Sequence, residues 1–365
     1  MKVLVGSFGP NLYTLEFDSV KGQFTKLNEQ VSGTRPSWLI PSKDESLIYC
    51  VDEADNFFGT GDFEKKVGLV IVYKLEEDGK LTKVQQVLSG GGAPTHMSAT
   101  SDLKHIRVAN YSGGNYSTFA VDESGLLSRV QVTDLSVGLE LGPQKDRQDG
   151  SHAHWVGHSA LTEGKFVYGT DLGQDKIFQY KVSEDGSLVP LNPPFIRARP
   201  NAGPRHVAFH PSQPWVYVLN ELDSTLSAFS FDVQTGKLSS ERQHLSTSPD
   251  AKPGMTCPSA ILTDKAGKFI YISNRDISSD KSGSNAIGVY KVEEDGTFSH
   301  VQTVSSVGLY PRHAALSPDE KWLVVGNQHS AQIDLFARDP VSGKIEWNKS
   351  FGGLDRACYI QFLSK

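Results

Sequence analysis

The sequence contains few cysteines and no long apolar segment. Its 365 residues include three cysteines, Cys50, Cys257 and Cys358, which form an odd and widely spaced set. Such a set does not suit a disulfide framework and favours a reducing compartment. No apolar run approaches the roughly 20 residues of a membrane span. The N-terminal segment MKVLVGSFGPNLYTLEF is typical of a strand rather than a signal peptide. We therefore expect a cytoplasmic protein with no membrane partner.

Basic charge and several catalytic motifs are also missing. The formal net charge is −6 at pH 7, whereas nucleic acids and anionic membranes attract a basic face. Neither is predicted as a partner. No Gly-rich phosphate loop opens a helix, and no Gly-x-Ser-x-Gly elbow is present. Any hydrolysis is therefore expected to use activated water or an intramolecular carboxylate rather than an acyl-serine.

A metal site is not predicted either. His152, His154 and His158 lie close together in the sequence, and a His-x-His pair on a strand places two imidazoles on one side. No spaced carboxylate or cysteine completes a recognisable ligand set. We therefore predict no metal and no cofactor.

What the sequence does contain is an internal repeat. A short strand pattern, a turn and a second apolar strand recur in copies that begin at Pro36, Pro94, His152, Pro204, Pro258 and Pro311. A third alternating strand, an acidic-Gly turn and a fourth strand follow, as in the segment from residue 69 to residue 87. The period is roughly 50 to 60 residues with four strands per unit, which is the blade length of a β-propeller.

The two ends of the chain supply complementary fragments of one more unit. The segment RACYIQFLSK from Arg356 is typical of an innermost strand without partners, and residues 2–32 resemble three strands that lack an innermost one. Six copies alone allow a six-bladed ring with loose ends, but joining the fragments makes a seventh blade and removes exposed sheet edges. We predict an all-β, seven-bladed propeller, with four antiparallel strands per blade, as a single domain over residues 1–365. Neither a Trp-Asp repeat nor a kelch-type double glycine marks the blades.

Two insertions lengthen the repeat. Ala54 to Val67 extends a turn in the first full copy, and Ser136 to Ser151 extends the approach to the third. Long polar loops in a compact fold are often functional.

The repeat also predicts where charged residues gather. Successive strands of an antiparallel blade run in opposite directions, so the start of strand one and the end of strand two share one face. Arg205 and His206 start a first strand, and Glu221 ends the second strand of the same blade. The corresponding positions are therefore expected at one mouth of the central channel: His96, His152, His154, Arg312 and His313 at strand starts, and Glu53, Asn110, Tyr111, Asp171, Asn274, Arg275, Asn327 and Gln328 at strand ends.

Two interpretations of this set remain open. Arginines can hold a carboxylate or phosphate bidentately, and a His or Glu with a shifted pKa can move protons. The alternative is that such residues only form salt bridges between blades. Asn110, Asp171 and Asn274 are more typical of residues that bond the backbone of their own turn. The remaining histidines are expected on the surface or in packing contacts: His158, His210, His244, His300 and His329.

Several motifs identify a family. They are Ala93-Pro94-Thr95-His96 with Ala109-Asn110-Tyr111, Arg147-Gln148 with His152-Ala153-His154, Asp171-Leu172-Gly173-Gln174-Asp175, Gly203-Pro204-Arg205-His206 with Asn220-Glu221-Leu222, Asn274-Arg275, and Pro311-Arg312 with Gly326-Asn327-Gln328. Over essentially its full length the chain resembles the seven-bladed propeller lactonases, the family of bacterial 6-phosphogluconolactonase and fungal 3-carboxy-cis,cis-muconate cycloisomerase.

The resemblance implies a metal-independent site at the channel mouth. Its working residues would be a His, two Arg and a Glu, which correspond to His154 (or His152), Arg205, Arg275 and Glu221. The segment HSALTEGKF lacks the usual Ser-Pro-Asp-Gly turn and is two residues longer, so the choice of histidine stays open. The residues expected to bind substrate are His152, His96, His206, Arg312, His313 and Glu53.

The expected function is hydrolysis of a sugar-acid lactone, such as 6-phosphogluconolactone or a related aldonolactone. In this scheme Arg205 and Arg275 clamp the anionic group and the oxyanion, and Glu221 or His154 deprotonates water. The first alternative is a muconate-type cycloisomerase acting on a muconate-like substrate with the same residues. The second is a non-catalytic binding scaffold, because many propellers only bind.

Overall fold

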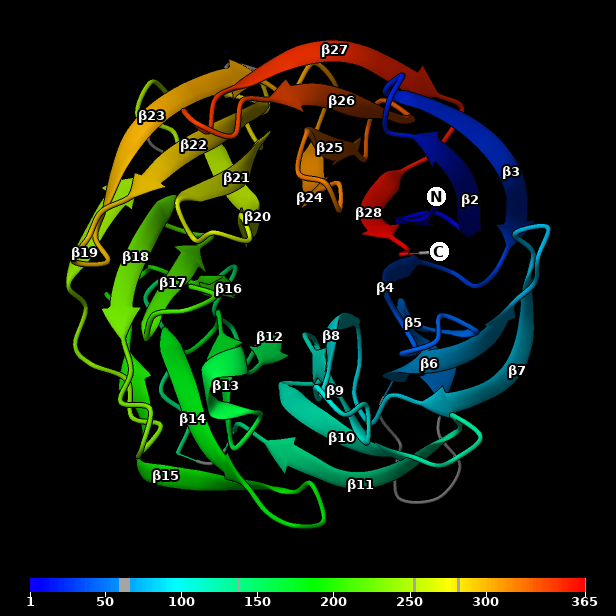
Figure 1. Ribbon diagram of the computed structural model, residues 1–365. Helices are drawn as coiled ribbons and strands as arrows, with labels where there is room; N and C mark the ends of the chain where they lie inside the picture. The colour runs from blue at the N-terminus through cyan, green and yellow to red at the C-terminus, as the bar shows by residue number, and fades with distance from the viewer. Residues whose placement is uncertain (59–65, 137, 252–253, 281–282, 365) are drawn as a thin grey trace.

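The strands form blades around a central opening (Figure 1). The structure is a computed structural model that describes residues 1–58, 66–136, 138–251, 254–280 and 283–364. The described residues form seven four-stranded sheets, and neighbouring strands within each sheet are antiparallel. The predicted all-β, seven-bladed propeller is confirmed.

In the six continuous blades the chain runs from the channel outward. The first three are β4 (Pro36–Pro41), β5 (Leu47–Phe58), β6 (Lys66–Leu75) and β7 (Leu81–Leu88); β8 (Pro94–Ala99), β9 (His105–Asn110), β10 (Asn115–Val121) and β11 (Leu127–Asp134); and β12 (Ala153–Gly157), β13 (Phe166–Asp171), β14 (Lys176–Val182) and β15 (Leu188–Arg197), with the 3₁₀ turn η1 (Ala160–Thr162) after β12. The next three are β16 (Pro204–Phe209), β17 (Trp215–Asn220), β18 (Thr225–Ser230) and β19 (Gln243–Ser246); β20 (Thr256–Thr263), β21 (Phe269–Asp276), β22 (Ala286–Val292) and β23 (Phe298–Ser305); and β24 (Pro311–Leu316), β25 (Trp322–Asn327), β26 (Gln332–Arg338) and β27 (Ile345–Gly352).

The remaining blade joins the two ends of the chain. Its strand order is β28 (Ala357–Phe362), β1 (Lys2–Ser7), β2 (Asn11–Asp18) and β3 (Gln23–Val31). β28 pairs antiparallel with β1, and Val3 lies opposite Phe362. Figure 1 shows both termini beside this blade. The sequence prediction of a blade sewn from both ends is therefore confirmed, and the pairing closes the ring where an open array would leave edges.

Burial explains why inner and outer strands differ in composition. The second strand of a blade lies between two neighbouring blades, so both of its faces pack; β17 is buried at every position after Trp215. The outermost strand packs on only part of its surface, and β27 is exposed at most positions. The apolar clusters lie between adjacent blades, as between Tyr217 on β17 and Ile270 on β21. Stability is thus distributed around the ring rather than held in one central core.

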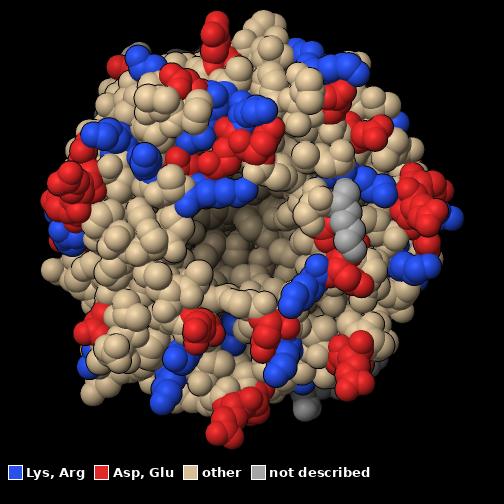
Figure 2. Space-filling model, in the orientation of Figure 1, with Lys and Arg blue, Asp and Glu red and all other residues tan. Residues whose placement is uncertain are grey.

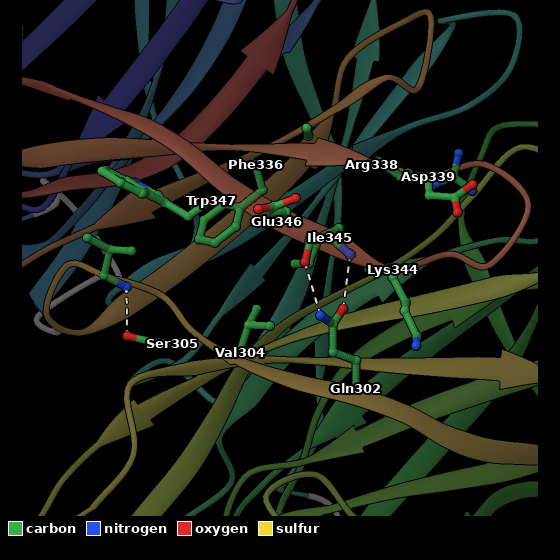
Figure 3. Close-up of a pocket in the computed structure, with 12 residues that line it drawn as sticks. Gln302, Val304, Ser305, Phe336, Arg338, Asp339, Lys344, Ile345, Glu346 and Trp347 are labelled. Carbon is green, nitrogen blue, oxygen red and sulfur yellow. Dashed lines mark hydrogen bonds between the residues drawn. The ribbon is translucent and has the colours of Figure 1, made fainter.

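Glutamine side chains tie neighbouring blades together at their outer strands. In the rim pocket of Figure 3, Gln302 accepts a hydrogen bond from the Ile345 amide at 2.9 Å and donates one to its carbonyl at 3.1 Å. The same paired bonds join Gln30 to Leu81, Gln85 to Leu127, Gln131 to Leu188 and Gln243 to Phe298. This pocket, about 700 Å³ in volume, lies between β23 and β27 and is separate from the channel.

The first insertion extends a hairpin, and the second packs as a loop beside the channel. The insertion from Ala54 to Val67 continues the β5–β6 hairpin, in which Phe57 pairs with Val67, and its tip, residues 59–65, lies outside the described residues. The loop from Ser136 to Ser151 is described except at residue 137. Gln148 in this loop donates to the Leu172 carbonyl at 2.9 Å. The loop is thus docked on the turn between β13 and β14, beside the channel mouth.

Candidate active site

Each innermost strand contains a β-bulge near its start. In β16, Pro204 pairs with Asn220 and His206 pairs with Leu219, which leaves Arg205 as the extra residue. The register shifts at the corresponding place in the other six blades. A bulge re-aims side chains that would otherwise alternate between opposite directions. Consecutive residues such as Arg205 and His206 can therefore both face the channel.

The bulges divide the channel into two compartments. The bulged residues and the ends of the second strands line a cavity of about 290 Å³, here named the arginine pocket: Phe8, Glu53, Thr95, Tyr111, Arg147, His154, Arg205, Glu221, Cys257, Arg275, Ile277, Tyr310 and Arg312. The next residues, with the later part of the innermost strands, line a cavity of about 440 Å³, here named the ring chamber after the aromatic rings in its lining: Trp38, His96, Trp155, His206, His313, Tyr359 and Phe362. Its lining also includes the charged residues Lys265 and Glu320. Figure 2 shows the opening as a deep hollow with an uncharged interior and charged side chains on its rim.

The backbone next to Arg205 requires glycine. Gly203 has φ +61°, and a Cβ atom there would lie 2.4 Å from Leu222 Cγ. The Gly203 carbonyl accepts the Glu221 amide at 2.8 Å. A residue with a side chain would therefore disturb the turn that brings Arg205 and Glu221 together.

Glu221 is the centre of the arginine pocket. Its Oε2 atom lies 2.6 Å from Arg205 Nε, 3.2 Å from Arg275 Nη2 and 3.9 Å from His154 Nε2. Its Oε1 atom lies 2.6 Å from Arg147 Nη2. The Glu221 side chain is only 6% exposed, so these ion pairs are poorly screened by water. The blade geometry predicted from sequence is therefore correct for His154, Arg205, Glu221 and Arg275.

The charges in this cluster control one another. Burial by itself would raise the pKa of Glu221, but Arg275, Arg205 and Arg147 outweigh it and hold that pKa well below its usual range. Burial, followed by the positive charge of Arg205, holds the pKa of His154 well below its usual range as well. The resting pocket thus contains an ionised Glu221 carboxylate and a neutral His154 imidazole. A protonated imidazole there would be repelled by the neighbouring guanidiniums.

A second ion pair completes the pocket. Arg312 Nη2 lies 3.2 Å from Glu53 Oε1, and the Arg312 guanidinium lies 4.4 Å from the centre of the Phe8 ring. Across the lining residues four guanidiniums face two carboxylates. With its imidazole neutral, the pocket has an excess of two positive charges and is built to receive an anion.

The two candidate histidines separate clearly. His154 lines the arginine pocket, whereas His152 Nε2 contacts Asp149 Oδ1 at 2.8 Å. The His152 ring stacks on Tyr111 with ring centres 4.5 Å apart. Tyr111 is itself part of the lining, so His152 supports the wall of the pocket from behind.

Three of the predicted substrate-binding histidines lie in the ring chamber instead of the arginine pocket: His96, His206 and His313. The bulge is the physical reason, because each follows a bulged residue and points to the other compartment. His206 links the two compartments, since Arg205 Nη1 donates to its Nε2 atom at 2.9 Å. The proton of the neutral His206 ring is therefore on Nδ1.

Trp38 occupies the middle of the ring chamber. Its ring centre lies 4.3 Å from that of His96, 5.5 Å from that of His313 and 4.4 Å from that of Tyr359. Burial, followed by the charge of Arg205, lowers the pKa of His313 to about 3. Burial likewise holds the pKa of His96 well below its usual range. The rings of the chamber thus form an uncharged aromatic layer next to the charged pocket, and the charged lining residues Lys265 and Glu320 lie in the turns that follow β20 and β24.

The polar residues expected in turns have structural partners. Asp171 accepts the amides of Gly173 at 2.9 Å and Gln174 at 3.2 Å, as predicted for a turn residue. Asn274 instead donates to the Thr247 carbonyl at 3.0 Å, and Asn110 donates to Asn115 Oδ1 at 2.8 Å. Asn274 thus holds a neighbouring loop in place, and Asn110 closes its own hairpin between β9 and β10.

Sequence reasoning assigned no function to Arg147, which is a direct partner of Glu221. Two signals were available: Arg147 lies in the long polar loop from Ser136 to Ser151, and it belongs to one of the family motifs. Its neighbour in space is 74 residues away. Tyr310 was also missed; its ring lies 5.1 Å from the Arg275 guanidinium.

Known proteins share this architecture over the whole chain. The family described as "Lactonase, 7-bladed beta-propeller" matches residues 2–362. A 6-phosphogluconolactonase of Bacillus subtilis is 30% identical over 354 residues, covering 96% of this chain and 94% of the relative. One of Formosa agariphila is 27% identical, covering 94% of each. The solved structure of the periplasmic gluconolactonase of Pseudomonas aeruginosa has a TM-score of 0.85 and 27% identity, covering 100% of this chain and 99% of that one.

The family match, the full-length sequence similarity and the similarity of fold all indicate the same family. The described part of the chain contains no helix with the length and apolar character of a membrane-spanning segment. The chain belongs to the seven-bladed β-propeller lactonases, and its activity is the hydrolytic opening of a lactone ring.

Proposed function

We propose that the arginine pocket hydrolyses the lactone of an anionic sugar acid, with 6-phosphogluconolactone or a closely related aldonolactone as the substrate. The excess of two positive charges in a small buried pocket is the observation that carries the proposal. The names of the relatives from Bacillus subtilis and Formosa agariphila support the same substrate class. No structural observation favours ring closure of a muconate over ring opening.

Arg312 and Arg147 are the best placed residues to receive the anionic group of the substrate. They are the two more accessible guanidiniums, with side chains 16% and 38% exposed. Arg205 and Arg275 lie deeper, at 3% and 4%. Arg275 Nε is buried and has no hydrogen-bond partner among the described residues. This unpaired donor is suited to the oxyanion that forms when water attacks the lactone carbonyl.

Glu221 and His154 supply the proton transfers. Glu221 removes a proton from water as the water oxygen bonds to the carbonyl carbon. The bond between that carbon and the ring oxygen then breaks, and neutral His154 gives its proton to the leaving oxygen. Glu221 returns its proton to His154 in the same step, so that no imidazolate forms, as the two side chains close the 3.9 Å between Glu221 Oε2 and His154 Nε2 to hydrogen-bond distance. The product is an open-chain hydroxy acid, and both side chains regain their starting states.

The other predicted binding residues support this site indirectly. His206 accepts a hydrogen bond from Arg205 and orients it, and Glu53 orients Arg312. His96 and His313 belong to the packing layer beneath. We include a cytosolic location in the proposal because all three cysteines are free and buried thiols; the Pseudomonas aeruginosa neighbour is described as periplasmic, so cell fractionation tests this part.

Ring opening should be measured directly. We expect the purified protein to accelerate hydrolysis of 6-phosphogluconolactone, and to a smaller extent unphosphorylated gluconolactone, above their spontaneous rates. Carboxymuconate serves as the comparison substrate for ring closure. Acceleration of neither lactone would contradict the proposed function, and acceleration of muconate closure alone would replace it.

A further inference from the structure

We propose that Arg147 is an exchangeable partner of Glu221: an anionic group of the substrate takes Arg147 from Oε1 of Glu221, and this exchange frees Oε1 to activate water. Arg147 thereby makes the rate of ring opening depend on the charge of the substrate. The inference rests on the proposed function and adds a residue that selects for anionic lactones.

The two oxygens of Glu221 are held differently. Oε2 contacts Arg205 at 2.6 Å and Arg275 at 3.2 Å, with His154 at 3.9 Å. Among the described residues Arg147 is the one ion-pair partner of Oε1, at 2.6 Å. Movement of this single side chain would release one oxygen and leave the other fully held.

The three arginines are also anchored differently. Arg205 donates to the Ser259 carbonyl as well as to His206, and Arg275 donates to the Pro258 carbonyl at 3.0 Å. Both belong to buried strand ends. Arg147 lies on the Ser136–Ser151 loop, and its side chain donates to Glu221 and also interacts with the Tyr111 side chain. Moving Arg147 away from Oε1 therefore breaks one charge-assisted hydrogen bond, which an incoming anion replaces, while the neutral Tyr111 hydroxyl holds Arg147 less strongly than the carboxylate does.

The exchange removes an obstacle to catalysis. A carboxylate held by three guanidiniums is a weak base, because efficient general bases have a pKa near the working pH. The groups that face Glu221 are Arg147, Arg205, Arg275 and His154, with Tyr111 and Cys257 nearby. Loss of Arg147 to the substrate, together with the negative charge that the substrate brings, raises the pKa of Glu221 and makes it a stronger base.

This arrangement predicts selectivity in turnover as well as in binding. A neutral lactone occupies the pocket without drawing Arg147 away, so Glu221 stays fully clamped. An anionic lactone pairs with Arg147 in the complex in which water attacks. Part of its binding energy is then used in the chemical step, which raises kcat in addition to lowering KM.

The test compares Arg147→Gln with the intact enzyme on 6-phosphogluconolactone and on unphosphorylated gluconolactone. We expect the ratio of kcat/KM for the phosphorylated over the neutral substrate to fall by about tenfold or more. In the intact enzyme, the acidic limb of the kcat–pH profile should lie at higher pH for the phosphorylated substrate than for the neutral one. In R147Q the separation between the two limbs should shrink, because the contribution of Arg147 is absent with either substrate and only the charge of the substrate itself remains.

Arg197→Gln is the matched control. Arg197 is an exposed arginine that forms an ion pair with Glu140 in the same loop, and it lies outside the arginine pocket. R197Q should leave the substrate ratio and both pH limbs unchanged. If R197Q reproduces the effect of R147Q, loosening of the loop explains it and the inference is wrong.

Two further outcomes also contradict the inference. An equal loss for both substrates in R147Q would make Arg147 only a support for Glu221, and an unchanged ratio would exclude the exchange. If the intact enzyme opens neither lactone, the proposed function itself fails. If it opens lactones and R147Q keeps the selectivity, the exchange alone fails.

Discussion

The arginine pocket and the ring chamber are built by neighbouring residues of the same strands, yet they have opposite electrostatics. Arg205 and His206 are consecutive, and the first lines the pocket while the second lines the chamber. In the pocket, buried charges persist because each has a partner of opposite sign. In the chamber burial is the main influence on His96 and His313, and it keeps their imidazoles neutral.

This difference separates chemistry from packing. A protein that must hold ions in a low-dielectric channel needs a rigid layer beneath them, because a site that can relax stops stabilising a developing charge. The chamber supplies that layer, and the hydrogen bond from Arg205 to His206 joins the two. We therefore expect substitutions in the pocket to change turnover and substitutions in the chamber to change stability.

The largest expected effect is that of Glu221→Gln. The amide cannot accept the proton from water, so kcat should fall by about 10² to 10⁴-fold. The variant also leaves three guanidiniums without a counter-charge, which should lower the free energy of unfolding by about 3 kcal/mol or more. Steady-state rates per folded molecule and urea unfolding measure the two effects.

Glu53→Gln is the control for this prediction. Glu53 lines the same pocket but contacts one arginine, at 3.2 Å. It should raise KM more than it lowers kcat. Equal loss of kcat in both variants would mean that Glu221 contributes only charge, and a base would have to be sought elsewhere.

The next largest effect is expected in the ring chamber, where a substitution should lower stability and leave turnover unchanged. Trp38→Ala removes the ring that contacts His96 and Tyr359, and it should lower the free energy of unfolding by about 3 kcal/mol, because the indole is partly accessible and fully buried aromatics cost more. We expect kcat per folded molecule to stay within about twofold. Trp347→Ala, at a ring that is 51% exposed on β27, should change neither. A loss of kcat in W38A as large as in E221Q would show that the compartments are not separable.

The smallest effect concerns pH. The ordinary pKa of His313 is 6.5, and in the folded protein it is lowered to about 3. Between these two pH values the unfolded chain binds a proton at His313 more readily than the folded protein does. The free energy of unfolding is therefore unaffected by His313 above about pH 6.5 and decreases as the pH falls below it. The slope is about 1.4 kcal/mol per pH unit for each such histidine. Urea unfolding at pH 5, 6 and 7 should therefore show that His313→Gln depends less steeply on pH than the intact protein.

His300→Gln, at an exposed position on β23, is the control for the pH measurement. Its pH dependence should match that of the intact protein. If H313Q also matches it, folding does not lower the pKa of His313, and the contrast with the arginine pocket loses its basis.

Much of the fold was predictable because its signals are local. Turn residues, apolar alternation and the spacing of Pro36, Pro94 and the later repeat starts identify the blades, and the fragments at the two ends identify the closure. The shared face of strand starts and strand ends follows from antiparallel direction alone. This argument from strand direction correctly placed His154, Arg205, Glu221 and Arg275 together, as the distances around Glu221 show.

Other features of the site depend on contacts that no local pattern specifies. The bulge in β16 moves His206 out of the pocket, and nothing in the residues Pro204-Arg205-His206 distinguishes a bulged strand from a regular one. The alignment left His152 and His154 open, and only the stacking of His152 on Tyr111 separates them.

The sequence by itself determined the ring: the repeat unit, the number of blades and the end of the channel at which charges gather, since each follows from strand length and direction within about 60 residues. Tertiary structure alone decided which charges touch. Arg147 reaches Glu221 across 74 residues of chain, because a loop without regular structure docks on the β13–β14 turn, and its position is set by hydrogen bonds from Gln148 rather than by any periodic pattern.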